Sequence, residues 1–238
     1  MTKMRIGQAF ATTIAEEMRR DPRIFVMGTD LFRRGGHFAQ VLGVGQEFGR
    51  DRVRDAPISE AGLVSAGVGA ALNGMRPVVD LNFVDFALGA MDEIVNQAAK
   101  VRYMSGGADM PLVIRASSGV AAYAAQHNNS LEGVFAGTPG LFVVMPTTPA
   151  DTRGLLQTCL RDNRDPVVFM MPKRLSSIRE DVDLDAAPIP LGRASVRVPG
   201  TDVTLVSYGA TVRKCVAAAQ QLADEGIQAE VIDLRCLA

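Results

Sequence analysis

The sequence predicts an α/β protein in which a parallel sheet carries helices on both faces and a second α/β domain begins near the C-terminal end. Between residues 6 and 170, apolar residues recur at helical spacing and then in short continuous runs. This alternation is typical of helices joined to buried parallel strands. The composition changes over residues 176–190, so we place a first domain with its linker at 1–190 and part of a second at 191–238.

The first two helix-strand units are predicted by spacing and by their end signals. Apolar residues recur at four-residue steps near the start, namely Ile6, Phe10, Ile14 and Met18. A strand follows at 24–27, and Pro22 separates the two because the residue before a proline avoids the helical conformation. The second helix covers 61–73 and ends at Gly74, which suits a left-handed cap, and a strand follows at 77–81.

The remaining units of the first domain follow the same order. A third helix is predicted over 88–102, with one stripe formed by Met91, Val95, Ala98 and Arg102 and flanked by Ile94 and Val101. A strand at 112–114 follows it. Two more strands are predicted at 141–145 and 167–170, joined by a helix that begins near Pro149 and a return loop at 162–166.

The sequence after residue 190 predicts one further unit, a strand, a helix and a second strand. Residues 176–190 are interpreted as an interdomain linker, because acidic residues accompany prolines there without a helical stripe. A strand at 203–207, a helix at 211–225 and a strand at 229–233 follow. One such unit cannot enclose a core, since a domain needs two packed layers. We therefore expect the second domain to be cut short or completed elsewhere.

Composition excludes several classes of function. The chain has 238 residues, 47% of them hydrophobic, with 25 basic and 26 acidic side chains, which is too balanced for a nucleic-acid or membrane-surface binder. The three cysteines are an odd number without metal-binding spacing, so neither a disulfide framework nor a zinc site is indicated. The N-terminus lacks the apolar core of a signal peptide. We expect a soluble protein of the reducing cytoplasm.

Familiar catalytic motifs are absent, and histidine is scarce. There is no GxxxxGK[ST] phosphate loop, no HExxH and no GxSxG, and the glycines at 67–72 lack the third small residue of a dinucleotide fingerprint. Only His37 and His127 can provide imidazole chemistry. His127 lies in an uncharged loop after a predicted strand, where ligands of parallel sheets bind. It is either a proton carrier or a loop residue whose ring is satisfied by a backbone carbonyl.

Glu60 is the most informative carboxylate. It stands where a strand-like segment meets a helix rich in glycine and alanine. One interpretation is a helix-start acid favoured by the dipole, with Ser59 as the cap. The other is a functional group, because the small residues allow close approach of another chain, and burial would then raise the pKa of an unpaired carboxyl. Phe83 and Phe86 could add a stacking surface, although such aromatics are usually core.

Several blocks of sequence resemble one family. The chain is similar to the β subunits of thiamine-diphosphate-dependent 2-oxoacid dehydrogenases, a group that includes pyruvate, branched-chain 2-oxoacid and acetoin dehydrogenases. The blocks that carry the resemblance are 51–60 (DRVRDAPISE), 92–100 (DEIVNQAAK), 102–107 (RYMSGG), 125–127 (AQH) and 139–141 (PGL). The resemblance spans nearly the whole chain and ends inside the family's C-terminal domain.

The resemblance implies a transketolase-like pyrimidine-binding domain and a cofactor shared between chains. Thiamine diphosphate would lie between this domain and an α subunit, which supplies the GDG motif and holds magnesium. This chain has no GDG. A heterotetramer of two α and two β chains is implied, together with a lipoyl-bearing acyltransferase that accepts the acyl group.

The resemblance also assigns roles to single residues. Glu60 matches the glutamate that hydrogen-bonds a pyrimidine nitrogen and favours the imino tautomer. Phe86 matches the aromatic that packs on the pyrimidine, while Ile58 and Asn82 match positions lining that pocket. His127 would assist proton transfer or acyl transfer to a lipoyl group. Backbone carbonyls at four further positions match a potassium site found in some members, namely Leu112, Cys159, Leu160 and Asp162.

Some positions depart from the family. Asn128-Asn129 replaces the Ser-Gln that commonly follows the matching histidine, and Ala121-Ala122-Tyr123 replaces a glycine-rich lead-in. One residue is inserted near Arg164-Asp165, within the segment of the potassium site. His37 matches no catalytic position and is interpreted as a loop residue near the partner subunit.

The main hypothesis is a β subunit that, with its α partner, decarboxylates pyruvate or a branched-chain 2-oxoacid oxidatively and passes the acyl group to lipoamide. Acetoin cleavage is the enzyme alternative. A non-catalytic assembly subunit is the alternative of another class, because the loop is altered and the second domain is incomplete.

Overall fold

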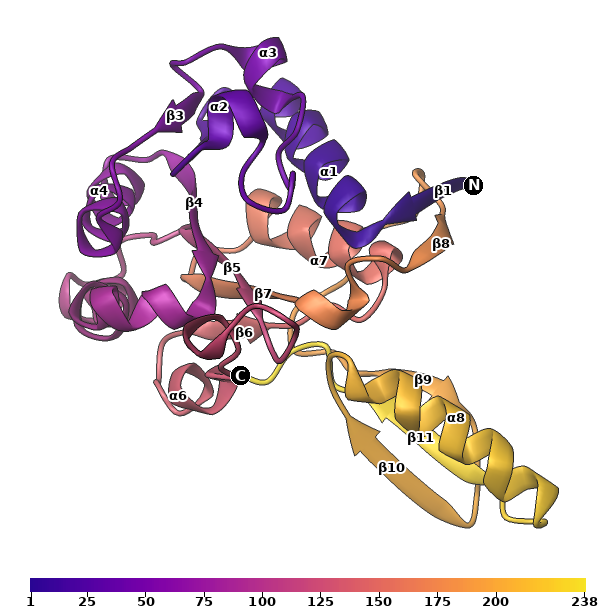
Figure 1. Cartoon of the computed structure of the whole chain (residues 1–238). Coiled ribbons are helices and arrows are strands. Elements are labelled where there is room, and N and C mark those ends of the chain that lie inside the picture. Colours follow the sequence, from indigo (N-terminus) through magenta and orange to yellow (C-terminus); the bar gives the residue numbers. More distant parts are fainter.

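A six-stranded parallel sheet forms the centre of the molecule, with strand order β3-β2-β4-β5-β7-β6 (Figure 1). The computed structural model describes residues 1–238. The strands are β2 Ile24–Gly28, β3 Val53–Asp55, β4 Arg76–Phe83, β5 Val113–Ser118, β6 Phe142–Val144 and β7 Val167–Pro172. The predicted parallel sheet with helices on both faces is confirmed. Of these six strands, only the short β3 was not predicted as a strand of its own.

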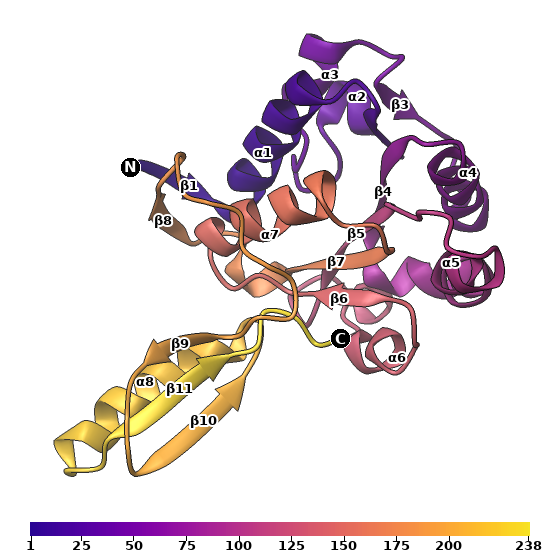
Figure 2. The same cartoon turned by 180° about the vertical axis from the view of Figure 1, so that it is seen from behind.

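Each face of this sheet is covered by its own set of helices. On one face lie α1 (Ile6–Arg20) and α7 (Pro149–Arg161), which pack against each other over a core that includes Phe10 and Phe169 (Figure 2). On the other face lie α4 (Glu60–Leu72), the helical stretch from 84 to 104, and α6 (Glu132–Ala136). Two short helices, α2 (Leu31–Arg34) and α3 (Val44–Phe48), connect β2 to β3.

The helix predicted over 88–102 is longer and less regular than expected. It begins as a 3-10 helix (Val84–Ala90), widens into a π-helical turn (Glu93–Ala98) and ends as α5 (Ala99–Met104). Ile94 and Ala98 are fully buried, whereas Met91 and Val95 are only partly buried. The core-facing stripe is therefore centred beside the one predicted, because the helix does not keep one winding along its length.

Residues 176–190 dock on the first unit along most of their length. They contain β8 (Arg179–Val182), which pairs antiparallel with the N-terminal strand β1 (Thr2–Arg5). Further along, the Ile189 N–H donates to Gly154 O of α7 at 3.0 Å. A Cβ atom on Gly154 would lie 2.5 Å from Cγ1 of Ile189, so this contact requires glycine. The acidic and proline-rich segment is thus held against α7 while it leads to the second unit.

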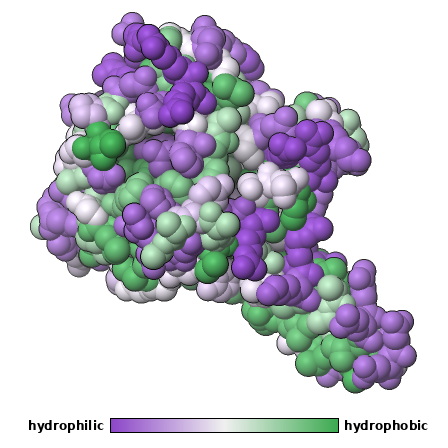
Figure 3. Space-filling model, in the orientation of Figure 1, coloured by the Kyte–Doolittle hydropathy of each residue, from purple (hydrophilic) through white to green (hydrophobic).

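The second unit is a small sheet with one helix. Its strands β9 (Ser195–Val198), β10 (Val203–Ser207) and β11 (Ala229–Asp233) take the order β10-β11-β9, and α8 (Thr211–Asp224) packs on one face. Only four residues form its buried core: Val212, Ala219, Ala229 and Val231. Val196 and Val206 are more than half exposed, and Figure 3 shows apolar surface on this unit.

A buried ion network joins the two units. Arg197 of β9 forms salt bridges with Asp151, in the first turn of α7, and with Asp233 of β11. Arg235 pairs with the same Asp151 at 3.2 Å. The C-terminal residues then return to the edge of the large sheet, where the Leu237 N–H donates to Val143 O at 2.8 Å (Figure 1). Breaking one partner of such a buried network leaves an uncompensated charge, so the units are held in one arrangement.

Candidate active site at the carboxyl edge of the sheet

Six rings gather where the parallel strands end, and we name this group the ring cluster. Its members are His37, Phe38, Phe83, Phe86, Tyr123 and His127. They come from the β2–α3 connection, the end of β4 and the loop after β5. The carboxyl edge of a parallel sheet is the usual place for a ligand site, because loops from several strands meet there.

Phe83 is the centre of the ring cluster. Its ring centroid lies 4.5 Å from that of His127, 5.1 Å from that of His37 and 5.3 Å from that of Phe38. Most of these contacts are edge-to-face, the geometry that the aromatic quadrupole favours. Phe83 itself is buried, so it is the support on which the more exposed rings are arranged.

The loop that carries His127 is fixed by the two asparagines that follow it. Asn128 Oδ1 accepts the Ala121 N–H at 2.6 Å, and the Asn128 side-chain amide donates to Ala124 O. Asn129 donates to Asp85 Oδ1 through both its backbone N–H and its side chain, at 3.0 and 2.6 Å. The two asparagines at 128–129 therefore tie the loop to itself and to Asp85.

Lys173 lies beneath this loop and was not identified from the sequence. It follows β7 directly and is 5% exposed, and its ammonium donates to the backbone oxygen of His127. The same ammonium is 5.2 Å from the Phe83 ring centroid. Burial lowers the pKa of Lys173, while Asp85 and Glu132 oppose that shift. The available signal was a lysine placed at the end of a continuous apolar strand.

The acids near Lys173 are themselves buried. Glu132 accepts a hydrogen bond from the Ser118 hydroxyl, and Asp85 accepts from Asn129. The second oxygen of Asp85, Oδ2, is buried without a hydrogen-bond partner. A buried acceptor without a donor costs free energy of folding. Asp85 Oδ2 is therefore an open acceptor beside the His127 loop.

Glu60 stands at the start of α4, as predicted, but it is only half-buried and its side chain forms no hydrogen bond or salt bridge within the chain. Ser59 precedes it without capping the helix through its side chain. The expectation of a buried carboxyl is therefore not met within this chain alone. Ile58 is also prominent, with 79% of the residue exposed. Both side chains remain available to a cofactor or to another chain.

Two of the predicted site residues, Asn82 and Phe86, lie near the His127 loop, whereas Ile58 and Glu60 lie farther along the same edge of the sheet. Asn82 lies at the end of β4 and Phe86 in the 3-10 helix that follows it, and the ring centroid of Phe86 is 5.4 Å from that of His127. Asn82 adopts φ 60°, and its Oδ1 accepts the His37 N–H at 3.4 Å. Ile58 and Glu60 follow β3, two strands away at the same edge, and α4 packs against the helical turn that holds Phe86.

His37 is a loop residue, but it belongs to the ring cluster. Its exposed side chain packs edge-on against Phe38 at 4.9 Å. Sequence reasoning gave it no chemistry, since it matches no motif. Both histidines of the chain therefore contact the Phe83 ring.

The segments of the predicted potassium site lie next to each other. The Val167 N–H donates to Leu112 O at 2.9 Å, and Met110 donates to Arg164 O at 2.9 Å, which places the loop after α7 beside the start of β5. Cys159 and Leu160 are in the last turn of α7, and Asp162 is its C-cap. Arg76 donates to Asn163 O at 3.2 Å, so a guanidinium also lies at this end of the helix.

Comparison with known proteins identifies the family of the chain. The chain matches the transketolase pyrimidine-binding domain over residues 2–177 and the transketolase C-terminal domain over residues 192–238. It is 41% identical to the 2-oxoisovalerate dehydrogenase subunit beta of Bacillus subtilis, over 99% of this chain and 72% of that relative. The chain belongs to the β-subunit family of thiamine-dependent 2-oxoacid dehydrogenases.

Other members of the family are similarly close. The pyruvate dehydrogenase E1 component subunit beta of Bacillus subtilis is 41% identical, over 99% of this chain and 73% of the relative. The acetoin:2,6-dichlorophenolindophenol oxidoreductase subunit beta of Cupriavidus necator is 44% identical, over 99% of this chain and 72% of the relative. The sequence identities to the 2-oxoisovalerate, pyruvate and acetoin subunits are too similar to assign a substrate.

Solved structures share the fold of this β-subunit-family chain. A split-gene transketolase, described as an inactive beta4 tetramer, superposes with a TM-score of 0.79 at 25% identity, covering 97% of this chain and 71% of that one. Transketolase from Leishmania mexicana gives a TM-score of 0.78 at 16% identity, covering 99% of this chain and 35% of that one. The second likeness concerns the fold alone.

Two further observations concern metals and membranes. The chain contains no group of three or more His, Cys, Asp or Glu side chains arranged to hold a metal ion. None of its helices is both long and apolar enough to cross a bilayer.

Proposed function

We propose that this chain is the β subunit of a heteromeric first component of a 2-oxoacid dehydrogenase complex. The complex would decarboxylate pyruvate or a branched-chain 2-oxoacid oxidatively and transfer the acyl group to lipoamide with thiamine diphosphate. The observation that carries the proposal is the convergence of Asn82, Phe86 and His127 at one sheet edge in a chain of this family.

The side chains at this edge fit the pyrimidine half of thiamine diphosphate. Phe86 is half-exposed, so its ring has surface available for a heteroaromatic ring beside His127. The Glu60 carboxyl has no partner within the chain, and Ile58 adds apolar surface beside it. When bound, the cofactor supplies the nucleophilic carbon and the electron sink for decarboxylation.

Each residue then has one task. Glu60 would hold a proton between its carboxyl and a ring nitrogen of the pyrimidine. Asn82 and Ile58 would orient the ring, and Phe86 would exclude water from one side of it. His127 would donate or accept a proton near the donor, because imidazole changes its charge near neutral pH. Lys173 and Asn129 fix the backbone of the loop, and the His127 ring packs against Phe83 and Phe86.

The proposal includes partners. The sequence has no GDG motif for the diphosphate, so an α subunit would supply that motif and the magnesium ion. The relatives are named as beta subunits, and the split-gene transketolase is described as inactive in its beta4 form. These names support a partner α chain. We propose that two α and two β chains assemble and that the complex serves a lipoyl-bearing acyltransferase. A reducing cytoplasm is the proposed compartment, since all three cysteines are unpaired.

One alternative reaction is favoured by a specific observation. The acetoin oxidoreductase subunit of Cupriavidus necator is 44% identical, so acetoin cleavage on the same residues is the second candidate. A non-catalytic assembly subunit is the alternative of another class. It is weakened by the ordered His127 loop, in which the departing asparagines make well-defined hydrogen bonds.

A potassium ion is a further part of the proposal. The carbonyls of Leu112, Cys159 and Leu160 and residue Asp162 would hold it at the C-terminal end of α7, where the negative end of the helix dipole favours a cation. Its contribution would be to the stability of the loop after α7 and not to the reaction itself.

The experiment is a comparison of Glu60→Gln with Glu93→Gln in the assembled α-β complex. Reduction of an artificial acceptor is measured with pyruvate, a branched-chain 2-oxoacid and acetoin. We expect Glu60→Gln to lower kcat by a factor of about 100 or more, a range typical for a proton-transfer group. Glu93 lies outside the site and controls for the loss of a carboxylate. Undiminished turnover in Glu60→Gln contradicts the proposed role, and no turnover of any donor by a cofactor-loaded complex favours the assembly subunit.

A further inference from the structure

Four members of the ring cluster contact one another in every combination: His37, Phe38, Phe83 and Tyr123. The six distances between their ring centroids range from 4.9 to 6.4 Å, and the longest joins His37 to Tyr123. His127 contacts the same Phe83 at 4.5 Å, so both imidazole centroids of the chain lie within 5.1 Å of one ring. A small donor over this edge of the sheet therefore meets two imidazoles and a phenol.

The polar ring atoms have no partner within the chain. His37, Tyr123 and His127 enter its hydrogen bonds only through backbone atoms. His37 and Tyr123 are exposed and His127 is half-buried, so a ligand reaches all three without passing the buried Phe83. Proton transfer is the task already proposed for His127. The imidazole of His37 and the hydroxyl of Tyr123 are two further groups whose capacity for hydrogen bonds is open.

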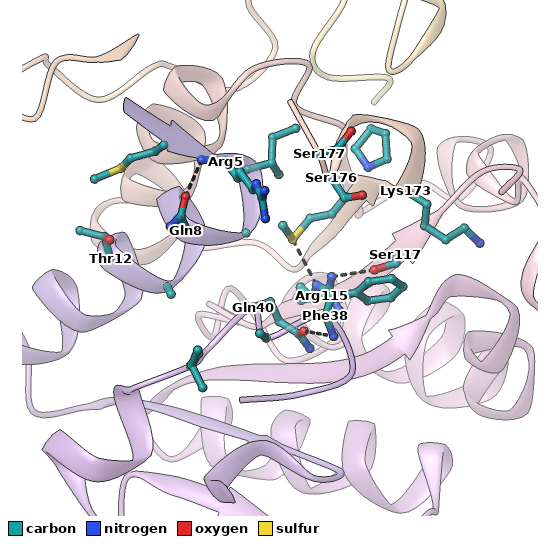
Figure 4. A pocket seen from close by; sticks show the side chains of 18 of the residues that line it. Arg5, Gln8, Thr12, Phe38, Gln40, Arg115, Ser117, Lys173, Ser176 and Ser177 are labelled. Carbon is teal, nitrogen blue, oxygen red and sulfur yellow. Dashed lines mark hydrogen bonds between the residues drawn. The ribbon is translucent and has the colours of Figure 1, made fainter. Parts of the chain in front are cut away.

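The loop that carries His37 is anchored to the core of the sheet. Gln40 is completely buried, its side-chain oxygen accepts the Phe38 N–H at 2.9 Å, and its side-chain amide donates to Asp80 of β4. Figure 4 shows Gln40 beside Phe38 and Arg115, and Arg115 forms a salt bridge with the same Asp80. His37 is thus an exposed ring on a fixed loop, which reduces the entropy lost when it binds a ligand.

The backbone next to Tyr123 is held in a conformation that is rare for alanine. Ala124 has φ 59° and ψ 177°, a region populated almost only by glycine, and such a conformation costs about 1–3 kcal/mol. The Asn128 side chain spans this point, because it accepts the Ala121 N–H and donates to Ala124 O. The loop bonds therefore fix Tyr123 in spite of local strain, a combination that concentrates at functional sites.

A pocket of about 570 Å³ adjoins His37 at the same edge, and Phe38 and Asn82 line it as well. Its only charged residues, Asp30 and Arg34, form an ion pair at 3.4 Å. Asn82 is one of the residues proposed to orient the pyrimidine. A group bound in this pocket would therefore lie beside the cofactor and meet no excess positive charge.

The cations next to these rings are buried and already bonded. Arg115 pairs with Asp80, and Lys173 donates to His127 O. A ligand over the rings therefore meets neutral hydrogen-bond donors. Such donors hold a carboxylate, whereas a free cation would also stabilise its charge against leaving as neutral carbon dioxide. Binding the ground state more tightly than the transition state slows the chemical step.

We propose that His37 and Tyr123 bind the departing carboxylate of the 2-oxoacid, through an imidazole N–H and the phenol hydroxyl. The inference rests on the proposed function, because it names the residues that hold the group which that reaction removes. The bond between the carboxyl carbon and the 2-oxo carbon breaks, its electron pair stays with the 2-oxo carbon, and carbon dioxide leaves. Neither residue gives or takes a proton in this step. Both act by binding and orienting the donor.

The test removes one hydroxyl or one imidazole at a time. Tyr123→Phe is compared with Tyr103→Phe, which removes the same group from a residue of α5 that is 92% exposed and outside the ring cluster. His37→Phe keeps a ring against Phe38 and Phe83, and His37→Gln returns a hydrogen-bond donor.

Each α-β complex is assayed by artificial-acceptor reduction with three donors. Pyruvate and acetoin carry a departing group, whereas acetaldehyde has the reacting carbonyl and no departing group. Binding of lactate, which has the carboxylate but no 2-oxo group, is measured by calorimetry on the same complexes.

We expect Tyr123→Phe and His37→Phe each to raise the KM for pyruvate and the Kd of lactate about tenfold or more, as for one hydrogen bond to a charged group. The kcat for pyruvate should change by less than about twofold, because a contact made equally before and during bond breaking affects KM alone. His37→Gln should restore part of the binding. Tyr103→Phe should change nothing, and the acetaldehyde reaction should be the same in all variants.

Several results would overturn the proposal. An unchanged KM for pyruvate in both Tyr123→Phe and His37→Phe does so and leaves the proposed function intact. An equal effect on acetaldehyde shows that the residues act on the carbonyl end, and an effect confined to acetoin assigns them to a hydroxyl and favours the second candidate reaction. If no donor is turned over, the proposed function fails. Lactate binding then decides separately, since dependence on Tyr123 supports the carboxylate site and independence contradicts it.

Discussion

Replacing Lys173 by methionine tests whether the buried lysine holds the His127 loop. The substitution keeps most of the apolar stem and removes the ammonium that donates to His127 O. A hydrogen bond from a charged donor contributes about 1.5–3 kcal/mol, and relief from burying the charge returns part of that. It also leaves Asp85 and Glu132 without their nearest cation. We expect a net loss of about 1–2 kcal/mol, which corresponds to a melting temperature roughly 2–8 °C lower for a chain of this size.

The measurement is thermal unfolding of the β chain, followed by turnover in the assembled complex. Lys214→Met is the matched control, because Lys214 is exposed on α8 and its loss should change the stability by no more than about 0.5 kcal/mol. Turnover should fall in Lys173→Met, since the His127 ring loses its fixed position. A melting temperature and a turnover that both match those of Lys214→Met would refute the reasoning.

The difference in stability between wild type and Lys173→Met should depend on pH in a definite direction. Burial lowers the pKa of Lys173 in the folded chain, so the unfolded chain binds more protons between that lowered value and the ordinary value of 10.5. Stability contributed by such a group is complete above 10.5 and is lost as the pH falls through the lowered pKa. The stability advantage of wild type over Lys173→Met should therefore grow as the pH rises toward 10.5. A shrinking advantage would contradict the assignment of burial as the main cause.

Two further predictions concern stability. Gly154→Ala should destabilise the chain by about 1–3 kcal/mol in urea unfolding, because the new Cβ would lie 2.5 Å from Ile189; an unchanged midpoint would show that residues 176–190 are not docked as described. Replacing potassium chloride by sodium chloride should lower the melting temperature. The lost free energy of stabilisation is roughly 2.7 kcal/mol if potassium was present at 100 times its Kd. A melting temperature that is equal in the two salts excludes the potassium site.

Local spacing predicted most of the first domain, for clear physical reasons. The four-residue steps of Ile6 to Met18 and the apolar runs at β4, β5 and β7 each depend on neighbours in sequence. What spacing could not predict was β1 pairing with β8, because that contact joins residues about 180 positions apart. The acidic and proline-rich composition of 176–190 indicated an interdomain linker, and most of the segment is exposed. It is nevertheless docked through backbone bonds and Ile189.

The candidate site likewise contains residues that the sequence could identify and residues that only the folded chain reveals. Glu60, Asn82, Phe86 and His127 could be named because motif blocks carried them, and their roles stay predictions. Lys173 could not be named by motif, since its role depends on a loop 46 residues earlier. His37 was set aside for a similar reason, because only the folded chain brings it to Phe83. Three-dimensional convergence is thus the information that one sequence lacks.

The two proposed catalytic groups are held in opposite ways, and this difference follows from their tasks. The loop of His127 is fixed by Lys173 and Asn129, both of which belong to this chain, so its ring can be positioned before any partner binds. Glu60 has no partner in the chain and is half-exposed. A carboxyl that must share a proton with a cofactor ring cannot be committed to an internal donor, because that donor would stabilise its charged form. The free state of Glu60 is therefore what a site completed between two chains requires.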